Sequence, residues 1–183
     1  MAYHIGCLET RWSGRATDEQ SVEPLLEVLK ATRKIHYIHR RCETTENFIY
    51  HLKALRRLSS LNLIYIATHG TPFTLHLARN QALVIDELED QMRIGFNGRI
   101  LHLGACRSML SHSETRWQKF MDETGVAAVS GYSGGVDWIE SAALELLWFA
   151  HLNSYSQLLA SIKGFKNIYP DLCERAHFQV FSR

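Results

Sequence analysis

Two largely apolar segments constrain the fold most strongly, residues 61–68 (LNLIYIAT) and 99–105 (RILHLGA). Neither shows the alternation of apolar and polar residues that marks a strand with one face in water. A strand that is apolar on both sides has to be covered on both sides, which is the usual situation in a parallel sheet with helices on its two faces. Residues 126–131 (VAAVSG) add a third central strand of this kind.

The rest of the chain alternates between strand-like and helix-like patterns. Further strands are predicted at 3–8, 35–39 and 177–181, and helices at 22–33, 45–60, 86–92, 114–124 (closed by Gly125) and 139–152. Residues 73–85 hold two short alternating runs, which predict a hairpin insertion. Residues 154–176 are expected to be helical, with breaks at Gly164 and Pro170.

This alternation of strands and helices predicts right-handed crossover connections between parallel strands. The expected fold class is therefore α/β, a three-layer sandwich with a mostly parallel central sheet and helices on both faces. The length of 183 residues predicts a single domain over residues 1–183.

The composition of the chain argues against several classes of function. The chain has 20 Lys+Arg against 19 Asp+Glu, a formal net charge of +1, so we expect no nucleic-acid partner. The most apolar window, residues 142–152, is about half as long as the ~20 residues that a membrane span requires, and it contains Glu145. The N-terminus lacks the pattern of a signal peptide. The expectation is a soluble, cytoplasmic protein with no membrane partner.

Neither a metal nor another cofactor is expected. The four cysteines, at positions 7, 42, 106 and 173, are far apart and form no C-x-x-C pair, so the thiols are expected to be free. His36, His39 and Cys42 are spaced by three, but residues i and i+3 of a strand face opposite sides of the sheet. The glycine-rich nucleotide-binding motifs are also absent.

The ends of two central strands carry a histidine and a cysteine. The first strand runs into His69-Gly70 and the second into Gly104-Ala105-Cys106. Sites in parallel α/β sheets lie beyond the carboxyl ends of the strands. If the two strands are neighbours, His69 and Cys106 project from one edge of the sheet, one or two strand spacings of about 4.8 Å apart.

Such a pair suits nucleophilic catalysis, because an imidazole beside a thiol supplies the base or the stabilising charge for a thiolate. Gly70 lets the backbone approach a substrate, and its N–H can join that of Cys106 as an oxyanion hole. The structural alternative is that Cys106 is a small buried apolar residue and His69 an ordinary loop residue.

The two strand ends resemble the paired signature of caspase-like (clan CD) cysteine peptidases, a hydrophobic strand ending in His-Gly and another ending in Ala-Cys or Gly-Cys. The matching segments are LIYIATHG and ILHLGACRS. Downstream, VAAVSGYSGGVDWIESAALELLWF resembles CHAT and separase-type domains, which have a strand, an Asp-containing loop and an amphipathic helix. The resemblance covers roughly residues 60–150.

The resemblance implies a caspase-like fold and a cysteine peptidase that acts on a protein or peptide substrate without a metal. His69 resembles the general base and acid, and Cys106 resembles the nucleophile. The amides of Gly70 and Cys106 would be the oxyanion donors. The chain departs from caspases at Gly104, where they carry Gln, and from CHAT and separase loops at Trp138, which follows the loop aspartate instead of preceding it.

Substrate preference in this family is set by a pocket whose matching regions here offer Glu9, Gly104 and Asp137. Two carboxylates and a small residue would suit an arginine or lysine side chain. Two observations point the other way. Asp137 is also placed to be the N-cap of the helix 139–152, and Arg11 weakens the pocket if it faces inward.

The leading hypothesis is a cysteine endopeptidase with a Cys106–His69 dyad, by analogy a bacterial defence or cell-death protease. One alternative is a catalytically silent caspase-like module for interaction or regulation, and the presence of both dyad residues argues against it. Another is a different α/β thiol hydrolase with Cys106 at a strand–helix elbow. The His-Gly at a neighbouring strand end favours the first hypothesis.

Overall fold

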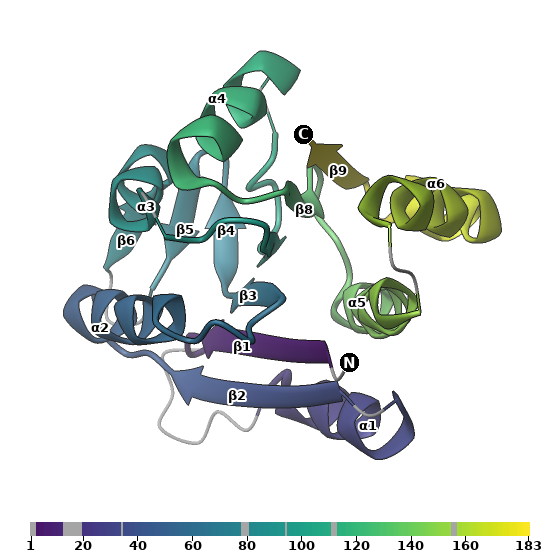
Figure 1. The fold of residues 1–183 in the computed structure, drawn as a ribbon, viewed down its shortest axis with the longest axis horizontal. Helices are drawn as coiled ribbons and strands as arrows, with labels where there is room; N and C mark the ends of the chain where they lie inside the picture. The colour runs from purple at the N-terminus through teal and green to yellow at the C-terminus, as the bar shows by residue number, and fades with distance from the viewer. Residues whose placement is uncertain are drawn as a thin grey trace.

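In the computed structural model, a central sheet of six strands has the order β2-β1-β3-β7-β8-β9 within the residues that the structure describes (Figure 1). Those residues are 3–12, 20–33, 35–77, 81–93, 95–110, 113–154 and 157–183. The strands are β1 (Tyr3–Glu9), β2 (Ile35–Arg41), β3 (Leu63–Ala67), β7 (Ile100–Gly104), β8 (Ala128–Tyr132) and β9 (Phe178–Ser182). The first five are parallel, and β9 pairs antiparallel with β8, so the predicted mostly parallel sheet is confirmed.

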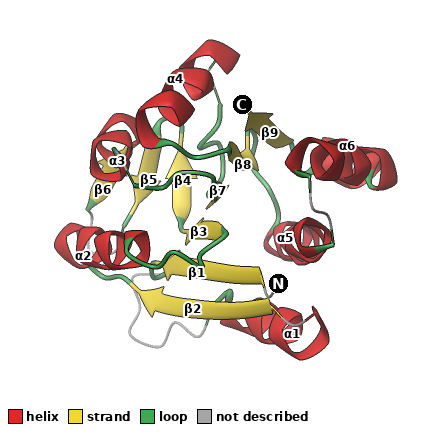
Figure 2. Ribbon diagram, viewed as in Figure 1, coloured by secondary structure: helices red, strands yellow, loops and turns green. Residues whose placement is uncertain are grey.

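Helices cover both faces of this sheet (Figure 2). One face carries α2 (Thr45–Arg56), α3 (Ile85–Met92) and α4 (Glu114–Thr124), and the other carries α1 (Glu23–Arg33), α5 (Trp138–Asn153), α6 (Leu158–Ile168) and α7 (Pro170–Arg175). The buried apolar residues divide into two clusters in the same way. The predicted three-layer sandwich is confirmed, and it explains why every residue of β3 is buried.

A small antiparallel sheet follows β3 directly, with the order β4 (His69–Thr71), β5 (Thr74–His76) and β6 (Ala82–Val84). The last two strands form the hairpin predicted at 73–85, of which residues 78–80 lie outside the described residues. The additional strand β4 arises because the chain turns back at Pro72-Phe73. Phe73 has a φ of 66°, and proline followed by a residue of positive φ is the pattern of a type II turn. His69 therefore lies where the two sheets meet.

Short-range interactions fix both ends of α4, of which the sequence predicted the end at Gly125. The Ser113 side chain accepts the Arg116 N–H at the start of α4, and Gly125 ends that helix with a φ of 82°. The break predicted at Gly164 is wrong, because α6 continues through it. A glycine inside a helix costs only about 1 kcal/mol, and the neighbouring Ile162 and Phe165 are buried in the core. Pro170 is the first residue of α7, where a proline is tolerated.

Among the helices that the structure describes, none combines the length and the apolar character needed to cross a membrane.

The buried faces of the central strands are expected to dominate stability. Leu101 of β7 is fully buried, so Leu101→Ala should lower the free energy of unfolding by about 2–5 kcal/mol through the cavity it leaves. Leu159→Ala is the matched control, because Leu159 of α6 is 57% exposed and its truncation should change stability by no more than about 0.5 kcal/mol. Urea denaturation measures both, and equal losses would contradict the layer assignment.

Candidate active site

The register between β3 and β7 places the two predicted dyad residues. These strands are adjacent and parallel, with Ala67 opposite Gly104, and the Thr68 N–H donates to the Gly104 carbonyl at 3.3 Å. His69 and Cys106 each come two residues after the Ala67–Gly104 pair. The prediction that the two strands are neighbours is confirmed, and both residues leave the sheet at its carboxyl edge.

A cavity of about 240 Å³ lies at this edge of the sheet. His69 and Cys106 both line it, and the other lining residues come from the strands β3, β7 and β8, from the segments that follow β1, β3 and β8, from the segment before α1, and from α5. His69 is exposed and Cys106 is partly exposed, so a molecule in the cavity reaches both. The cavity also lies on the face of the sheet that carries α1 and α5.

The ring of His69 is held by Trp12, which follows β1. Its Nε2 lies 2.6 Å from the Trp12 carbonyl oxygen, and the two rings pack edge to face with centroids 5.2 Å apart. A carbonyl only accepts hydrogen bonds, so Nε2 carries the proton. In the neutral imidazole the lone pair is then on Nδ1, which is the nitrogen able to act as a base. Sequence analysis missed Trp12, whose only signal was its place just after a strand end.

The turn that carries Cys106 is fixed by the loop after β8. The thiol lies 3.7 Å from the Val136 carbonyl oxygen, and the next N–H, that of Arg107, donates to the Gly134 carbonyl at 2.9 Å. Arg107 has a φ of 57°, a conformation that is strained for a residue with a side chain. Such strain concentrates at functional sites. All four cysteines are free, as predicted, and Cys106 is the one that is not buried.

Gly70 packs directly against the backbone at Cys106. A Cβ atom at position 70 would lie 2.5 Å from the Cys106 carbonyl oxygen and 2.9 Å from the Ala105 Cβ, closer than such atoms approach in proteins. Glycine is therefore required at this position by the packing of one strand end on the other. The backbones of Gly70 and Cys106 therefore lie close together.

Of the three residues predicted to line the substrate pocket, the structure places only Gly104 in the cavity wall. Asp137 is exposed, and its carboxylate accepts the Ile139 and Glu140 N–H groups at 2.8 and 3.2 Å. It is thus the N-cap of α5, as the alternative interpretation held. Arg11 is not among the lining residues, and its guanidinium pairs with Glu43 at 2.6 Å.

Glu9 is fully buried and is not in the cavity wall, which corrects the second pocket assignment. Its carboxylate accepts hydrogen bonds from Trp12 Nε1, Ser21 Oγ and the Val22 N–H at 2.7 to 2.8 Å, and His39 Nε2 lies 2.6 Å away. Burial by itself raises the pKa of Glu9, but these hydrogen bonds, that of His39 foremost, outweigh it and bring the pKa below its usual value. Glu9 instead holds Trp12, whose carbonyl orients His69.

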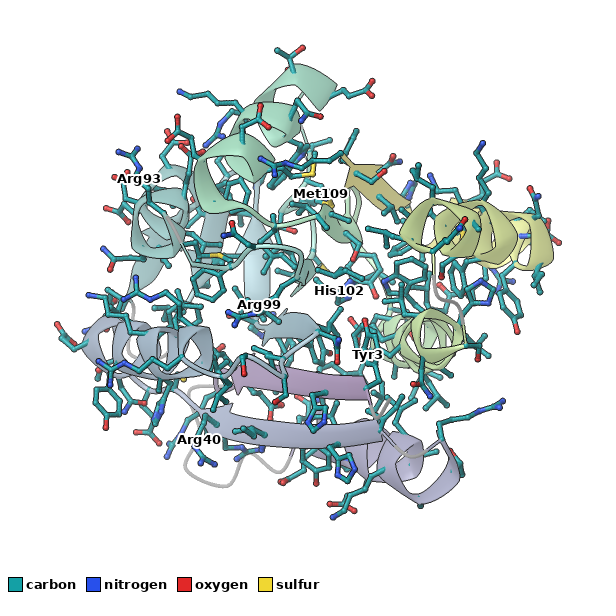
Figure 3. The ribbon with its side chains drawn as sticks, in the orientation of Figure 1. Tyr3, Arg40, Arg93, Arg99, His102 and Met109 are labelled. Carbon is teal, nitrogen blue, oxygen red and sulfur yellow. The ribbon has the colours of Figure 1, made fainter. Side chains whose placement is uncertain are left out.

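Glu145 of α5 is a second residue of the site that sequence analysis missed. It is 3% exposed, it lines the cavity, and its carboxylate lies 2.5 Å from Tyr65 Oη, 3.0 Å from Tyr132 Oη and 3.2 Å from His102 Nε2. Figure 3 shows His102 in the middle of the molecule, between the central strands and α5. The available signal was a glutamate inside the most apolar helix.

Gly104 makes room for this carboxylate. A Cβ atom at position 104 would lie 2.6 Å from Tyr65 Cε2 and 3.0 Å from Glu145 Oε1. The glutamine that caspases carry at the matching position would therefore not fit here without displacing both side chains.

The part of the chain that the structure describes contains no group of three or more His, Cys, Asp or Glu side chains placed to hold a metal ion. Within the set at His36, His39 and Cys42, the His39 ring faces Glu9.

Comparison with known proteins gives a family and a fold. The sequence model of DUF6642, a family of unknown function, matches residues 2–182, so the chain belongs to this family. No curated protein matches the chain. Among solved structures, the crystal structure of caspase-1 from Spodoptera frugiperda is similar, with a TM-score of 0.54 and 12% sequence identity over 99% of this chain and 86% of the caspase. The fold is therefore caspase-like. The closer resemblance to CHAT and separase-type domains stays a prediction.

The Glu9 hydrogen bonds predict a pH-dependent contribution to stability. Glu9→Gln leaves buried donors badly matched and should lower the free energy of unfolding at pH 7 by about 1–3 kcal/mol. Because the pKa of Glu9 is lowered in the folded state, the stabilisation is complete above its ordinary pKa of about 4.3 and is lost as the pH falls through the folded value. The difference between wild type and variant should therefore shrink below about pH 4.

Urea denaturation at a series of pH values measures this difference. Glu43→Gln is the matched control, since Glu43 forms an ion pair near the surface, where such pairs contribute about 0–1 kcal/mol. A pH-independent difference for Glu9→Gln would contradict the assignment of Glu9 as a buried, ionised residue.

Proposed function

The chain belongs to a family of unknown function. From the geometry of its site, we propose that it is a cysteine endopeptidase. Cys106 is the nucleophile and His69 the general base and acid, and the substrate is a protein or peptide. One observation carries this proposal: both side chains line a single cavity at the carboxyl ends of two neighbouring strands that pair in register. The caspase-like fold supports it.

The reaction follows from the orientation of His69. Its Nδ1 takes the thiol proton, and the Cys106 thiolate attacks the carbonyl carbon of the scissile peptide bond. The negative oxygen of the tetrahedral intermediate is bound by the amides of Gly70 and Cys106. The C–N bond breaks as His69 returns the proton to the leaving amine. Water, deprotonated by His69, then hydrolyses the thioester and regenerates the thiol.

The proposal extends by analogy to a bacterial defence or cell-death protease in the cytoplasm. The alternative, a catalytically silent module of the same fold, differs from it in one measurable property. A silent module needs no reactive thiol, whereas the proposed peptidase needs Cys106 to be nucleophilic at neutral pH.

Fluorogenic peptides that vary the residue before the scissile bond test the proposal. Cys106→Ala and His69→Ala should each lower kcat/KM by at least about 100-fold, because each removes a reacting group. Cys173→Ala and His76→Ala are the matched controls and should keep activity, since Cys173 is a buried residue of α7 and His76 contacts Thr71 in the small sheet.

Alkylation by iodoacetamide at pH 7 gives a second readout. Cys106 should react, and His69→Ala should slow its reaction. Peptide cleavage that survives in Cys106→Ala, or a Cys106 that neither cleaves any peptide nor reacts with iodoacetamide, would contradict the proposal.

The close contact at Gly70 gives a separate prediction. In Gly70→Ala the new methyl group collides with the Cys106 carbonyl, so the two strand ends have to move apart. Activity should fall about 10-fold or more, and the free energy of unfolding should fall by about 1–3 kcal/mol. Gly135→Ala is the control, because nothing lies within 4 Å of a Cβ there and both quantities should stay unchanged. Full activity in Gly70→Ala would exclude the close backbone approach from the mechanism.

A further inference from the structure

The buried carboxylate of Glu145 lines the cavity. We propose that this carboxylate forms a subsite for a cationic side chain, that of an arginine or a lysine. This inference names the substrate class of the proposed peptidase. It rests on the proposed function in one respect, because the bound side chain would belong to the peptide residue next to the scissile bond. The acidic residue of this pocket is then Glu145 of α5, whereas the sequence predicted Glu9 and Asp137.

The hydrogen-bond donors around Glu145 indicate the charge of its carboxylate. Burial raises the pKa of both Tyr65 and Tyr132 well above the usual value, so both hydroxyls stay protonated and can donate. They lie 2.5 and 3.0 Å from the two carboxylate oxygens. Each oxygen of the carboxylate thus has a hydroxyl donor of its own, an arrangement that favours the ionised form of Glu145.

The third partner, His102, is neutral by the same count. Trp148 Nε1 donates to Ser130 Oγ at 3.3 Å, and Ser130 Oγ lies 2.9 Å from His102 Nδ1. Because the Ser130 hydroxyl is buried, it uses its own proton to donate to Nδ1, which is then an acceptor. The His102 proton is therefore on Nε2 and points to Glu145. Hydroxyls and a neutral imidazole hold the carboxylate, and no cation is among these three partners.

An ionised carboxylate without a nearby cation is costly to bury, and it is stabilised when a cation is placed beside it. A carboxylate offers about four acceptor positions, of which three are used here, so one remains for an N–H group. Glu145 lines the cavity, whose described lining residues include no lysine or arginine. A cation bound in the cavity would supply a positive charge that the described lining residues do not provide.

The walls of the cavity suit the rest of such a side chain. Trp12 and Trp138 pack edge to face with ring centroids 4.5 Å apart, and both line the cavity together with Tyr65 and Tyr132. Aromatic walls bind the alkyl part of an arginine or lysine, and aromatic faces attract a cation. An aspartate side chain would instead meet the like charge of Glu145.

The catalytic test compares two matched fluorogenic peptides that differ only in arginine or citrulline before the scissile bond. Citrulline keeps the shape of arginine but has no charge, so wild type should prefer arginine by about 10-fold to 100-fold in kcat/KM. Glu145→Gln should abolish this preference. Tyr132→Phe is the matched control, because it removes one donor from the same carboxylate but keeps its charge, and it should retain the preference.

The binding test uses the Cys106→Ala protein and needs no catalysis. Butylguanidinium, the charged probe, should raise Tm at millimolar concentration, and butylurea, its neutral counterpart, should not. The rise in Tm should disappear in Cys106→Ala/Glu145→Gln. Circular dichroism establishes that each variant is folded. The comparison of the two probes in Cys106→Ala stands even if Glu145→Gln does not fold.

The outcomes separate this inference from the proposed function. Cleavage without a preference for arginine over citrulline, or with a preference for aspartate, would overturn the cationic subsite and leave the peptidase. Binding of butylguanidinium through Glu145 without cleavage of any peptide would overturn the peptidase and support the subsite. Equal effects of butylguanidinium and butylurea on the Cys106→Ala protein would overturn the subsite whatever the variants do.

Discussion

The candidate site depends on the in-register pairing of β3 with β7. Side chains of a strand alternate between its two faces, so a slip of one residue would turn every side chain of the strand to the opposite face. The register is fixed because both strands are buried between two layers of helices. The Thr68 N–H extends the pairing one step beyond the strands, to the Gly104 carbonyl. His69 and Cys106 follow this last hydrogen bond, so the packing of the core also sets their relative position.

Two buried glutamates, Glu9 and Glu145, lie near the site. Their surroundings differ, and so do their roles. Glu9 faces the protein, where His39 and Arg41 lie close to the carboxylate and Trp12 is held in place. Glu145 faces the cavity, and its three hydrogen-bond partners are two tyrosine hydroxyls and an imidazole. The first carboxylate is thus satisfied within the fold and positions a neighbour of His69. The second has three hydrogen-bond partners, which leaves one acceptor position for a bound group.

Much of the fold could be predicted from the sequence, because its signals are local. Apolar runs, helical spacing and the glycine that ends α4 each depend on a few neighbouring residues. The strand β4 was not predicted because three residues carry too little pattern. The helix break at Gly164 was wrong because burial of the residues around it outweighs the weak helix propensity of glycine.

The site could be predicted only as far as the topology reaches. His69 and Cys106 follow from the ends of two recognisable strands. The pocket assignment failed because it depends on where each side chain points after its strand ends. Glu9 turns inward to the start of α1, and Asp137 turns back to cap α5. Glu145 reaches the cavity through the packing of α5 on the sheet, which no local pattern of the sequence reports.

The close packing of Gly70 on Cys106 has a consequence for comparing this chain with its relatives. A side chain at position 70 is excluded by the backbone, whether or not the protein catalyses anything. A relative that had lost its activity in the course of evolution would still be under selection to keep this glycine, simply in order to fold. The glycine of the His-Gly pair is therefore a marker of shared ancestry and fold. Only the histidine and the cysteine can distinguish a relative that is active from one that has lost its activity.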